Sequence, residues 1–282
     1  MNSINIQTKP IQALIFTDLD GSLLDHFNYN TEPASPLLDQ LEARNIPVIF
    51  ATSKTFSEVL QLREQLDNQH PFIVENGAAV FIPKGYFSPQ VETRFNASHH
   101  PDFLLYSFCE NRCHWLDILE KLKPTFTQQF THFQEMGTKG IAKATGLSAE
   151  HALMANDRQF SEPVKWLGDA NEKENFIDVM RQNGANIEEG GRFLHLIGHC
   201  NKGTALSFLY EQYQTLQDEP ILSIALGDGK NDIPMLSAAD HAVLIRSPVH
   251  PFPVIDKEAL IKTDHYGPHG WVEGIKKILD IN

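Results

Sequence analysis

The chain has few cysteines and no long hydrophobic run, and both absences exclude classes of protein. Its 282 residues include 3 cysteines, Cys109, Cys113 and Cys200, too few for a disulfide framework, so we expect reduced thiols. No apolar run approaches the roughly 18 residues of a membrane-spanning helix, and residues 1–9 lack the basic and apolar regions of a secretory signal. The sequence therefore predicts a cytoplasmic protein that does not bind a membrane.

Basic residues are also scarce. The chain has 23 Lys and Arg against 36 Asp and Glu, a net charge of −13. It has no dense basic cluster of the kind that neutralises a phosphate backbone, which argues against a nucleic-acid partner. Hydrophobic residues make up 41% and charged residues 21% of the chain, as in ordinary globular proteins. The length favours one large domain with a second, smaller one.

A zinc site is an alternative use of the cysteines. Cys109 and Cys113 precede His114, and His99 and His100 lie upstream. A structural zinc site needs a second pair of ligands at suitable spacing, which this segment lacks. We therefore favour ordinary thiols over zinc.

Strand and helix patterns alternate at both ends of the chain. We expect strands at 11–16, 47–51, 71–74, 78–82, 221–226 and 241–245, and helices at 35–44, 55–66, 201–213 and 233–239. This alternation predicts an α/β fold with a Rossmann-like parallel sheet.

The middle of the chain has a different pattern. We expect helices at 114–122, 138–145, 149–156 and 172–183, and strands at 130–133, 164–167 and 193–197. These elements predict an inserted α+β domain at residues 86–195, between the two parts of the core, 1–85 and 196–282. Phe126, Phe130 and Phe133 resemble a sugar-stacking stripe, but we favour core packing for them.

Polar side chains follow the strands of the predicted parallel sheet. They are Asp18, Asp20, Thr52, Ser53, Asp228 and Asp232. The carboxyl ends of parallel strands share one edge of a sheet, where doubly wound folds bind ligands. Four carboxylates at this edge would repel one another without a cation, and an all-oxygen donor set suits Mg²⁺. We therefore predict a magnesium site at Asp18, Asp20, Asp228 and Asp232.

The same edge carries the groups that phosphoryl transfer needs. An aspartate nucleophile, a metal ion and a lysine together favour this reaction, and Lys202 in His199-Cys200-Asn201-Lys202-Gly203 is our candidate lysine. An acidic loop alone is more often a turn or a helix cap. The combination of all these segments favours catalysis.

These segments resemble the four motifs of the haloacid dehalogenase superfamily. The resemblance implies that Asp18 is the nucleophile that forms an aspartyl phosphate. It also implies that Asp20 is the general acid and base, and that its backbone carbonyl binds the metal. By the same resemblance, Ser53 binds a phosphoryl oxygen and Lys202 neutralises charge.

The resemblance extends to the rest of the magnesium site and to the insertion. It implies that Asp228 ligates the metal, and that Asp232 and Asn231 orient the metal's surroundings. The insertion resembles the large α/β cap of the superfamily's sugar phosphatases, a lid that supplies specificity.

Further segments resemble mannosyl-3-phosphoglycerate phosphatases. These are residues 52–55, 75–79, 137–147, 157–163 and 190–195. That resemblance implies a small-molecule substrate that carries a phosphate, a carboxylate and a hexose. The candidate substrate-binding residues are Thr52, Lys54, Glu75, Asn76, Lys139, Arg158, Ser161, Glu162, Arg192 and Asn231.

Side-chain chemistry suggests how some of these residues bind. Arg158 and Arg192 suit the carboxylate or the phosphate, and Ser161 and Glu162 suit sugar hydroxyls. Lys54 and Lys139 would add positive potential. Surface salt bridges are an equally good interpretation of each Arg and Lys.

Three other functions stay open. One is a less selective sugar-phosphate phosphatase of the same fold, and another is a phosphomutase-like phosphotransferase. The third is a binding module without catalysis, which both aspartates of the first loop argue against. The sequence leaves the sugar, mannosyl or glucosyl, and the oligomeric state open.

Overall fold

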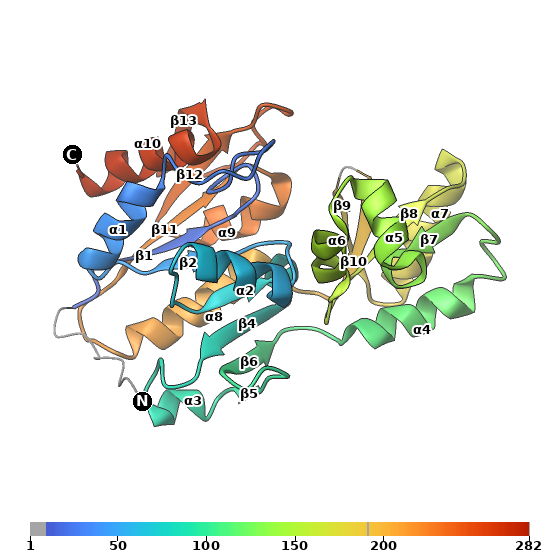
Figure 1. The fold of residues 1–282 in the computed structure, drawn as a ribbon, viewed down its shortest axis with the longest axis horizontal. Helices are drawn as coiled ribbons and strands as arrows, with labels where there is room; N and C mark the ends of the chain where they lie inside the picture. The colour runs from blue at the N-terminus through green and yellow to red at the C-terminus, as the bar shows by residue number, and fades with distance from the viewer. Residues whose placement is uncertain (1–9, 191, 282) are drawn as a thin grey trace. The chain divides into compact units, whose positions relative to one another are not determined.

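The computed structural model describes residues 10–190 and 192–281, and its chain forms two compact units (Figure 1). The core unit comprises Met1–Thr52, Gln65–Tyr106 and Asn201–Asn282, and the cap unit comprises Ser53–Glu64 and Ser107–Cys200. The insertion therefore begins near residue 107 rather than at 86, and residues 53–64 group with it. Gly191, in one of the segments that suggested the substrate, lies outside the described residues.

The core unit contains the predicted parallel sheet. Its five strands are ordered β13-β12-β11-β1-β2, and all four pairings are parallel. They are β1 (Ala13–Thr17), β2 (Val48–Phe50), β11 (Leu222–Gly227), β12 (His241–Arg246) and β13 (Leu260–Tyr266). Every residue of β1 is buried, as expected of a strand covered on both faces. The predicted α/β class is confirmed.

Helices precede or follow these strands along the chain. They are α1 (Ser35–Ala43), α8 (Lys202–Gln214), α9 (Ile233–Ala238) and α10 (Gly267–Leu279), with the short α3 (Pro89–Glu92) elsewhere in the unit. Asn201 caps α8, since its side chain accepts a hydrogen bond from the Thr204 amide. The buried Trp271 of α10 donates a hydrogen bond to Thr17 Oγ1 over 3.0 Å, which attaches α10 to the sheet.

A second sheet explains why the insertion begins later than predicted. It has the order β3-β4-β6-β5, formed by β3 (Phe72–Val74), β4 (Ala79–Pro83), β5 (Asn96–Ala97) and β6 (Phe103–Ser107). A parallel bridge between Ala51 and Ile73 links it to the end of β2. The Tyr106 ring stacks on Phe208 of α8 at 4.1 Å between centroids. Pairing and stacking therefore keep most of residues 86–106 in the core unit.

The cap unit has an antiparallel sheet of order β7-β8-β10-β9. Its strands are β7 (Phe130–His132), β8 (Glu162–Trp166), β9 (Asn186–Gly190) and β10 (Phe193–Ile197). Its helices are α4 (Arg112–Leu122), α5 (Phe133–Thr145), α6 (Ala149–Asn156) and α7 (Ala170–Gln182), with most of α2 (Phe56–Gln65).

Apolar side chains hold the cap unit together in two clusters. Trp115 of α4 and Phe176 of α7 pack on one face of the sheet with Phe126 and Phe130. Phe133 belongs to the second cluster, with residues of α5 and α6. All three phenylalanines of the apparent stacking stripe are therefore core residues, as we favoured.

Candidate active site

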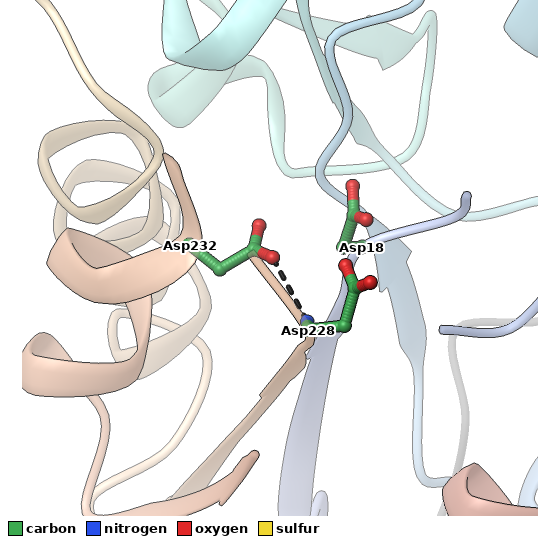
Figure 2. A group of neighbouring side chains, drawn as sticks. All are labelled: Asp18, Asp228 and Asp232. Atoms are coloured by element: carbon green, nitrogen blue, oxygen red, sulfur yellow. Dashed lines mark hydrogen bonds between the residues drawn. The ribbon is translucent and has the colours of Figure 1, made fainter. Parts of the chain in front are cut away.

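Three buried carboxylates meet at the carboxyl ends of β1 and β11 (Figure 2). Asp18 follows β1, Asp228 follows β11, and Asp232 ends the turn Lys230–Asp232 before α9. One oxygen from each lies within 4.8 Å of the others. Neighbouring parallel strands bring these residues to one edge, as the sequence predicted. Within the described part of the chain no cysteine joins a group able to hold a metal, so the zinc alternative gains no support.

Two glycines allow the carboxylates to approach this closely. Gly21 has φ +76°, and a Cβ there would lie 2.7 Å from Asp228 Oδ2. A Cβ on Gly227 would lie 2.5 Å from the Asp232 side chain. Any larger residue would displace a carboxylate, and at Gly21 it would also strain the backbone.

Lys202 lies between two of the carboxylates. It is the first residue of α8 and is fully buried. Its Nζ donates to Asp18 Oδ1 and to Asp232 Oδ1, over 2.6 Å each. Burial alone would lower the pKa of Lys202, but the charges of Asp18 and Asp232 raise it above its ordinary value. The lysine therefore stays charged.

One lysine does not balance three carboxylates. Burial and the charge of Asp232 raise the pKa of Asp18 well above its ordinary value, although Lys202 opposes them. Burial and Asp232 also raise the pKa of Asp228 to about 6. The site is therefore short of positive charge, and a divalent cation would relieve the repulsion.

The hydrogen bonds divide the carboxylates into two roles. Asp232 Oδ1 accepts from Lys202, and its Oδ2 accepts from the backbone amides of Asp228 (3.0 Å) and Gly229 (2.9 Å). Asp232 therefore holds the lysine and its own loop, and its predicted role as a direct metal ligand stays a prediction. Asp18 and Asp228 offer the hard oxygen donors that fit Mg²⁺.

Asp20 lies near this cluster, since its charge contributes to the raised pKa of Asp18. It is half-buried and follows Asp18 by two residues in the same loop. Its predicted roles in acid–base catalysis and in metal binding stay predictions.

Thr52, Asn76 and Asn231 join three loops at this edge. The buried Thr52 accepts a hydrogen bond at its carbonyl from the Asn76 amide (2.9 Å). Asn231 Nδ2 donates to Asn76 Oδ1 over 3.3 Å. Glu75, also buried, precedes Asn76 in the same turn. Direct contacts of these residues with substrate stay predictions.

Ser53 and Lys54 begin the segment that groups with the cap unit, and both are half-buried. Their predicted contacts with the phosphoryl group and the substrate stay predictions.

Arg158 and Ser161 lie together in the cap unit, as a shared binding role requires. Arg158 Nη1 donates to Ser161 Oγ over 2.7 Å. The guanidinium carbon lies 6.0 Å from the centre of the Phe133 ring. Lys139 is exposed on α5. The exposed Arg192 donates to the Ala144 carbonyl in the last turn of α5 (2.6 Å), a contact with the helix end that needs no ligand.

Glu162 is held by protein partners, and its predicted contact with a sugar stays a prediction. It is fully buried. Its Oε1 accepts from His132 Nδ1 and from the Gln134 amide, over 2.8 Å each, and its Oε2 accepts from Arg112 Nε. Burial alone would raise the pKa of Glu162, but the bonds from His132 and Arg112 lower it below its ordinary value. Glu162 is therefore the centre of a cap ion-pair network.

His195 is a candidate residue that the sequence reasoning missed. Burial and the nearby charge of Arg158 lower its pKa to about 3, so the imidazole is neutral. Leu194 and Leu196 point into the cap core, so His195 between them points to the other face of the sheet. This alternation was the available signal.

The chain is similar to a family of hydrolases and, over nearly its whole length, to two phosphatases. A family model described as haloacid dehalogenase-like hydrolase matches residues 15–248. A protein of Methanococcoides burtonii named glucosyl-3-phosphoglycerate/mannosyl-3-phosphoglycerate phosphatase is 34% identical over 96% of this chain and 99% of its own. A protein of Persephonella marina with the same name is 35% identical over 95% of this chain and 97% of its own.

A solved structure supports the fold. It is a phosphatase of the haloalkanoate enzyme superfamily from Bacteroides thetaiotaomicron, 16% identical, with a TM-score of 0.64 over 99% of this chain and 98% of that one. No helix in the described residues is both long and apolar enough to cross a membrane. The parallel sheet, the aspartates at its edge and these matches agree, and the chain belongs to the haloacid dehalogenase-like hydrolase family.

Proposed function

We propose that the protein is a Mg²⁺-dependent phosphatase that hydrolyses mannosyl-3-phosphoglycerate or glucosyl-3-phosphoglycerate to the glycosylglycerate and phosphate. The enzyme is a phosphoric monoester hydrolase of its family. The main support for the proposed reaction is the position of Asp18 beside Lys202 and Asp228. The choice of substrate rests on two relatives that are aligned over nearly their whole length.

Asp18 is the proposed nucleophile. Lys202 holds its Oδ1, which orients the carboxylate toward the substrate. An Asp18 oxygen attacks phosphorus, the P–O bond to the glycerate oxygen breaks, and Asp20 donates a proton to the leaving oxygen. Asp20 then takes a proton from water, whose oxygen attacks the aspartyl phosphate to release phosphate and restore Asp18.

Charge stabilisation accounts for much of the catalysis in this scheme. The Lys202 ammonium stays charged between Asp18 and Asp232, so it offsets negative charge on the phosphoryl oxygens. Mg²⁺ held by the carboxylates of Asp18 and Asp228 and the carbonyl of Asp20 would supply the positive charge that the site lacks. Ser53 would donate a hydrogen bond to the phosphoryl group.

The cap unit would select the substrate. Arg158 and Ser161 are the proposed partners of the substrate's carboxylate, because the pair presents a guanidinium and a hydroxyl 2.7 Å apart. The neutral His195 beside Arg158 would hydrogen-bond a sugar hydroxyl without adding charge. Lys139 and Lys54 would add positive potential.

A substrate panel tests this proposal. Phosphate release from the mannosyl and glucosyl compounds, and from simple hexose phosphates, is measured with and without Mg²⁺. Comparable efficiency on hexose phosphates would favour the broader sugar-phosphate phosphatase. Dependence of turnover on a sugar acceptor would favour the phosphotransferase.

Replacement of the nucleophile is the decisive variant. We expect Asp18→Asn to abolish turnover, a loss of at least about 10⁴-fold, because the amide oxygen is a poor nucleophile. The exposed Asp39→Asn on α1 is the matched control and should keep full activity. An active D18N enzyme would refute the mechanism.

A further inference from the structure

The turn after β3 has an unusual backbone. Glu75, Asn76 and Gly77 are consecutive residues with positive φ, at 47°, 57° and 92°. All three are buried. Left-handed backbone is disfavoured for residues with a Cβ, although Asn tolerates it better than most. Strain of this kind persists where the surrounding contacts require it, and it clusters at functional sites.

The turn contacts three loops of the active site. The Asn76 amide donates to the Thr52 carbonyl, and Asn76 Oδ1 accepts from Asn231. On the other side, a Cβ on Gly77 would lie 2.2 Å from the carbonyl carbon and oxygen of Asn201, the residue before Lys202. The turn is therefore packed between the loop after β2, the start of α8 and the loop after β11.

Asn231 lies in the loop that carries two of the carboxylates. It stands between Asp228 and Asp232 in the sequence and directly precedes Asp232. The Asp232 side chain is bonded to the amides of Asp228 and Gly229. A bond that fixes Asn231 therefore restrains the loop in which Asp228 and Asp232 are held.

We propose that Asn76 is a positioning residue for this site, acting through Asn231 and Thr52 instead of contacting the substrate. Glycine would adopt the left-handed backbone more readily than Asn, but it has no Oδ1 to accept from Asn231. The amide side chain therefore explains why this turn has Asn at the position. The consequence for catalysis rests on the proposed function.

Asn45 offers a matched control. It also has a positive φ, 61°, and it is buried. It lies between α1 and the start of β2, whereas the catalytic loops follow the ends of the strands. Asn→Gly at either position removes an amide and relieves the same backbone strain. The two variants therefore compare an amide bonded to the loop after β11 with an amide remote from that loop.

The test measures Mg²⁺-dependent hydrolysis of p-nitrophenyl phosphate, together with melting temperature. We expect Asn76→Gly to lower kcat about 10-fold or more, the usual effect of losing a supporting contact in a metal site, with little change in KM. Asn45→Gly should leave kcat unchanged. Neither variant should lower the melting temperature by more than a few degrees, because Gly suits both backbones.

A double-mutant cycle tests the route through Asn231. If Asn76 acts through it, the Asn76→Gly and Asn231→Ala variants should each lose activity, and the double variant should lose little more. Full multiplication of the two losses, or an N76G enzyme as active as N45G, would overturn the proposal. An inactive wild type would instead refute the proposed function.

A second substitution covers failure of N76G to fold. Asn76→Asp keeps an acceptor oxygen and tolerance of left-handed backbone. Its extra negative charge lowers activity by itself, so the double variant of Asn76→Asp with Asn231→Ala is compared with N76D and should lose little more activity. Full multiplication of the N76D and N231A losses in the folded double variant would also overturn the proposal.

Discussion

The core and cap units each bury a carboxylate beside a cation, but with different charge balance. In the core, Lys202 serves Asp18 and Asp232, while Asp228 lies within 4.8 Å of both. In the cap, the single carboxylate of Glu162 accepts from Arg112, His132 and a backbone amide. Burial and the charge of Asp232 raise the pKa of Asp18, whereas the bonds from His132 and Arg112 lower the pKa of Glu162 in spite of its burial.

The difference separates a site built for a ligand from a site built for structure. Negative charge in excess of its partners leaves the core with electrostatic repulsion that a bound cation would relieve. A carboxylate with all its partners in place has nothing left to offer a ligand, and it fixes the elements that supply those partners. Judged by burial and charge alone, the core carboxylates and Glu162 would have been assigned to the same kind of site.

Removal of the lysine should have the largest effect. Lys202→Met leaves Asp18 and Asp232 buried without their cation, so we expect phosphatase activity to fall by about 10³-fold or more. Activity is measured on p-nitrophenyl phosphate with Mg²⁺ in excess. Lys276→Met, an exposed lysine of α10, is the control and should be unaffected. A K202M enzyme within 10-fold of wild type would show that the metal alone balances the site.

The core site was predictable because its residues follow strand ends. The apolar runs predicted β1 and β11, and a parallel sheet brings the ends of its strands to one edge. Asp18 and Asp228 could therefore be grouped from positions that span more than half of the chain, whereas Lys202, which begins α8, was chosen because phosphoryl transfer needs a lysine. Asp232 was placed in the group, but its role as a hydrogen-bond acceptor for backbone amides depends on loop geometry that the sequence pattern does not contain.

The cap site was less predictable because its contacts are not set by strand ends. Glu162 at the start of β8 bonds to Arg112 at the start of α4 and to His132 at the end of β7. The sequence around Glu162 does not indicate these partners. The strand β9 was missed because Asn-Ile-Glu-Glu-Gly lacks the apolar alternation of a strand. Residues 86–106, which we assigned to the insertion, group with the core unit because β6 pairs in the second sheet.

Neutralising the cap carboxylate should have the next largest effect, on stability. Glu162→Gln leaves the Arg112 guanidinium buried without its counter-charge, and we expect the cap to lose about 3 kcal/mol. Stability is measured by unfolding in urea, with hydrogen exchange of the cap amides as the readout. Glu174→Gln, exposed on α7, is the control. Equal stability of E162Q and E174Q would show that Arg112 finds other partners, and the contrast with the core would fail.

The pH dependence of the cap should give the smallest effect, and its sign follows from the lowered pKa of Glu162. A carboxyl whose pKa is lower in the folded than in the unfolded state stabilises the fold above its ordinary pKa, here 4.5. That contribution is lost as the pH falls through the lower folded value.

The wild-type cap should therefore lose stability in acid relative to E162Q, which has no group to protonate at this position. The difference in free energy of unfolding between wild type and E162Q should reach its full value, about 3 kcal/mol, at about pH 7. At about pH 4 it should be smaller, because part of the Glu162 contribution is lost. Hydrogen exchange of cap amides at the two pH values measures it. A difference that grows in acid would mean that Glu162 is poorly paired, as the carboxylates of the core are.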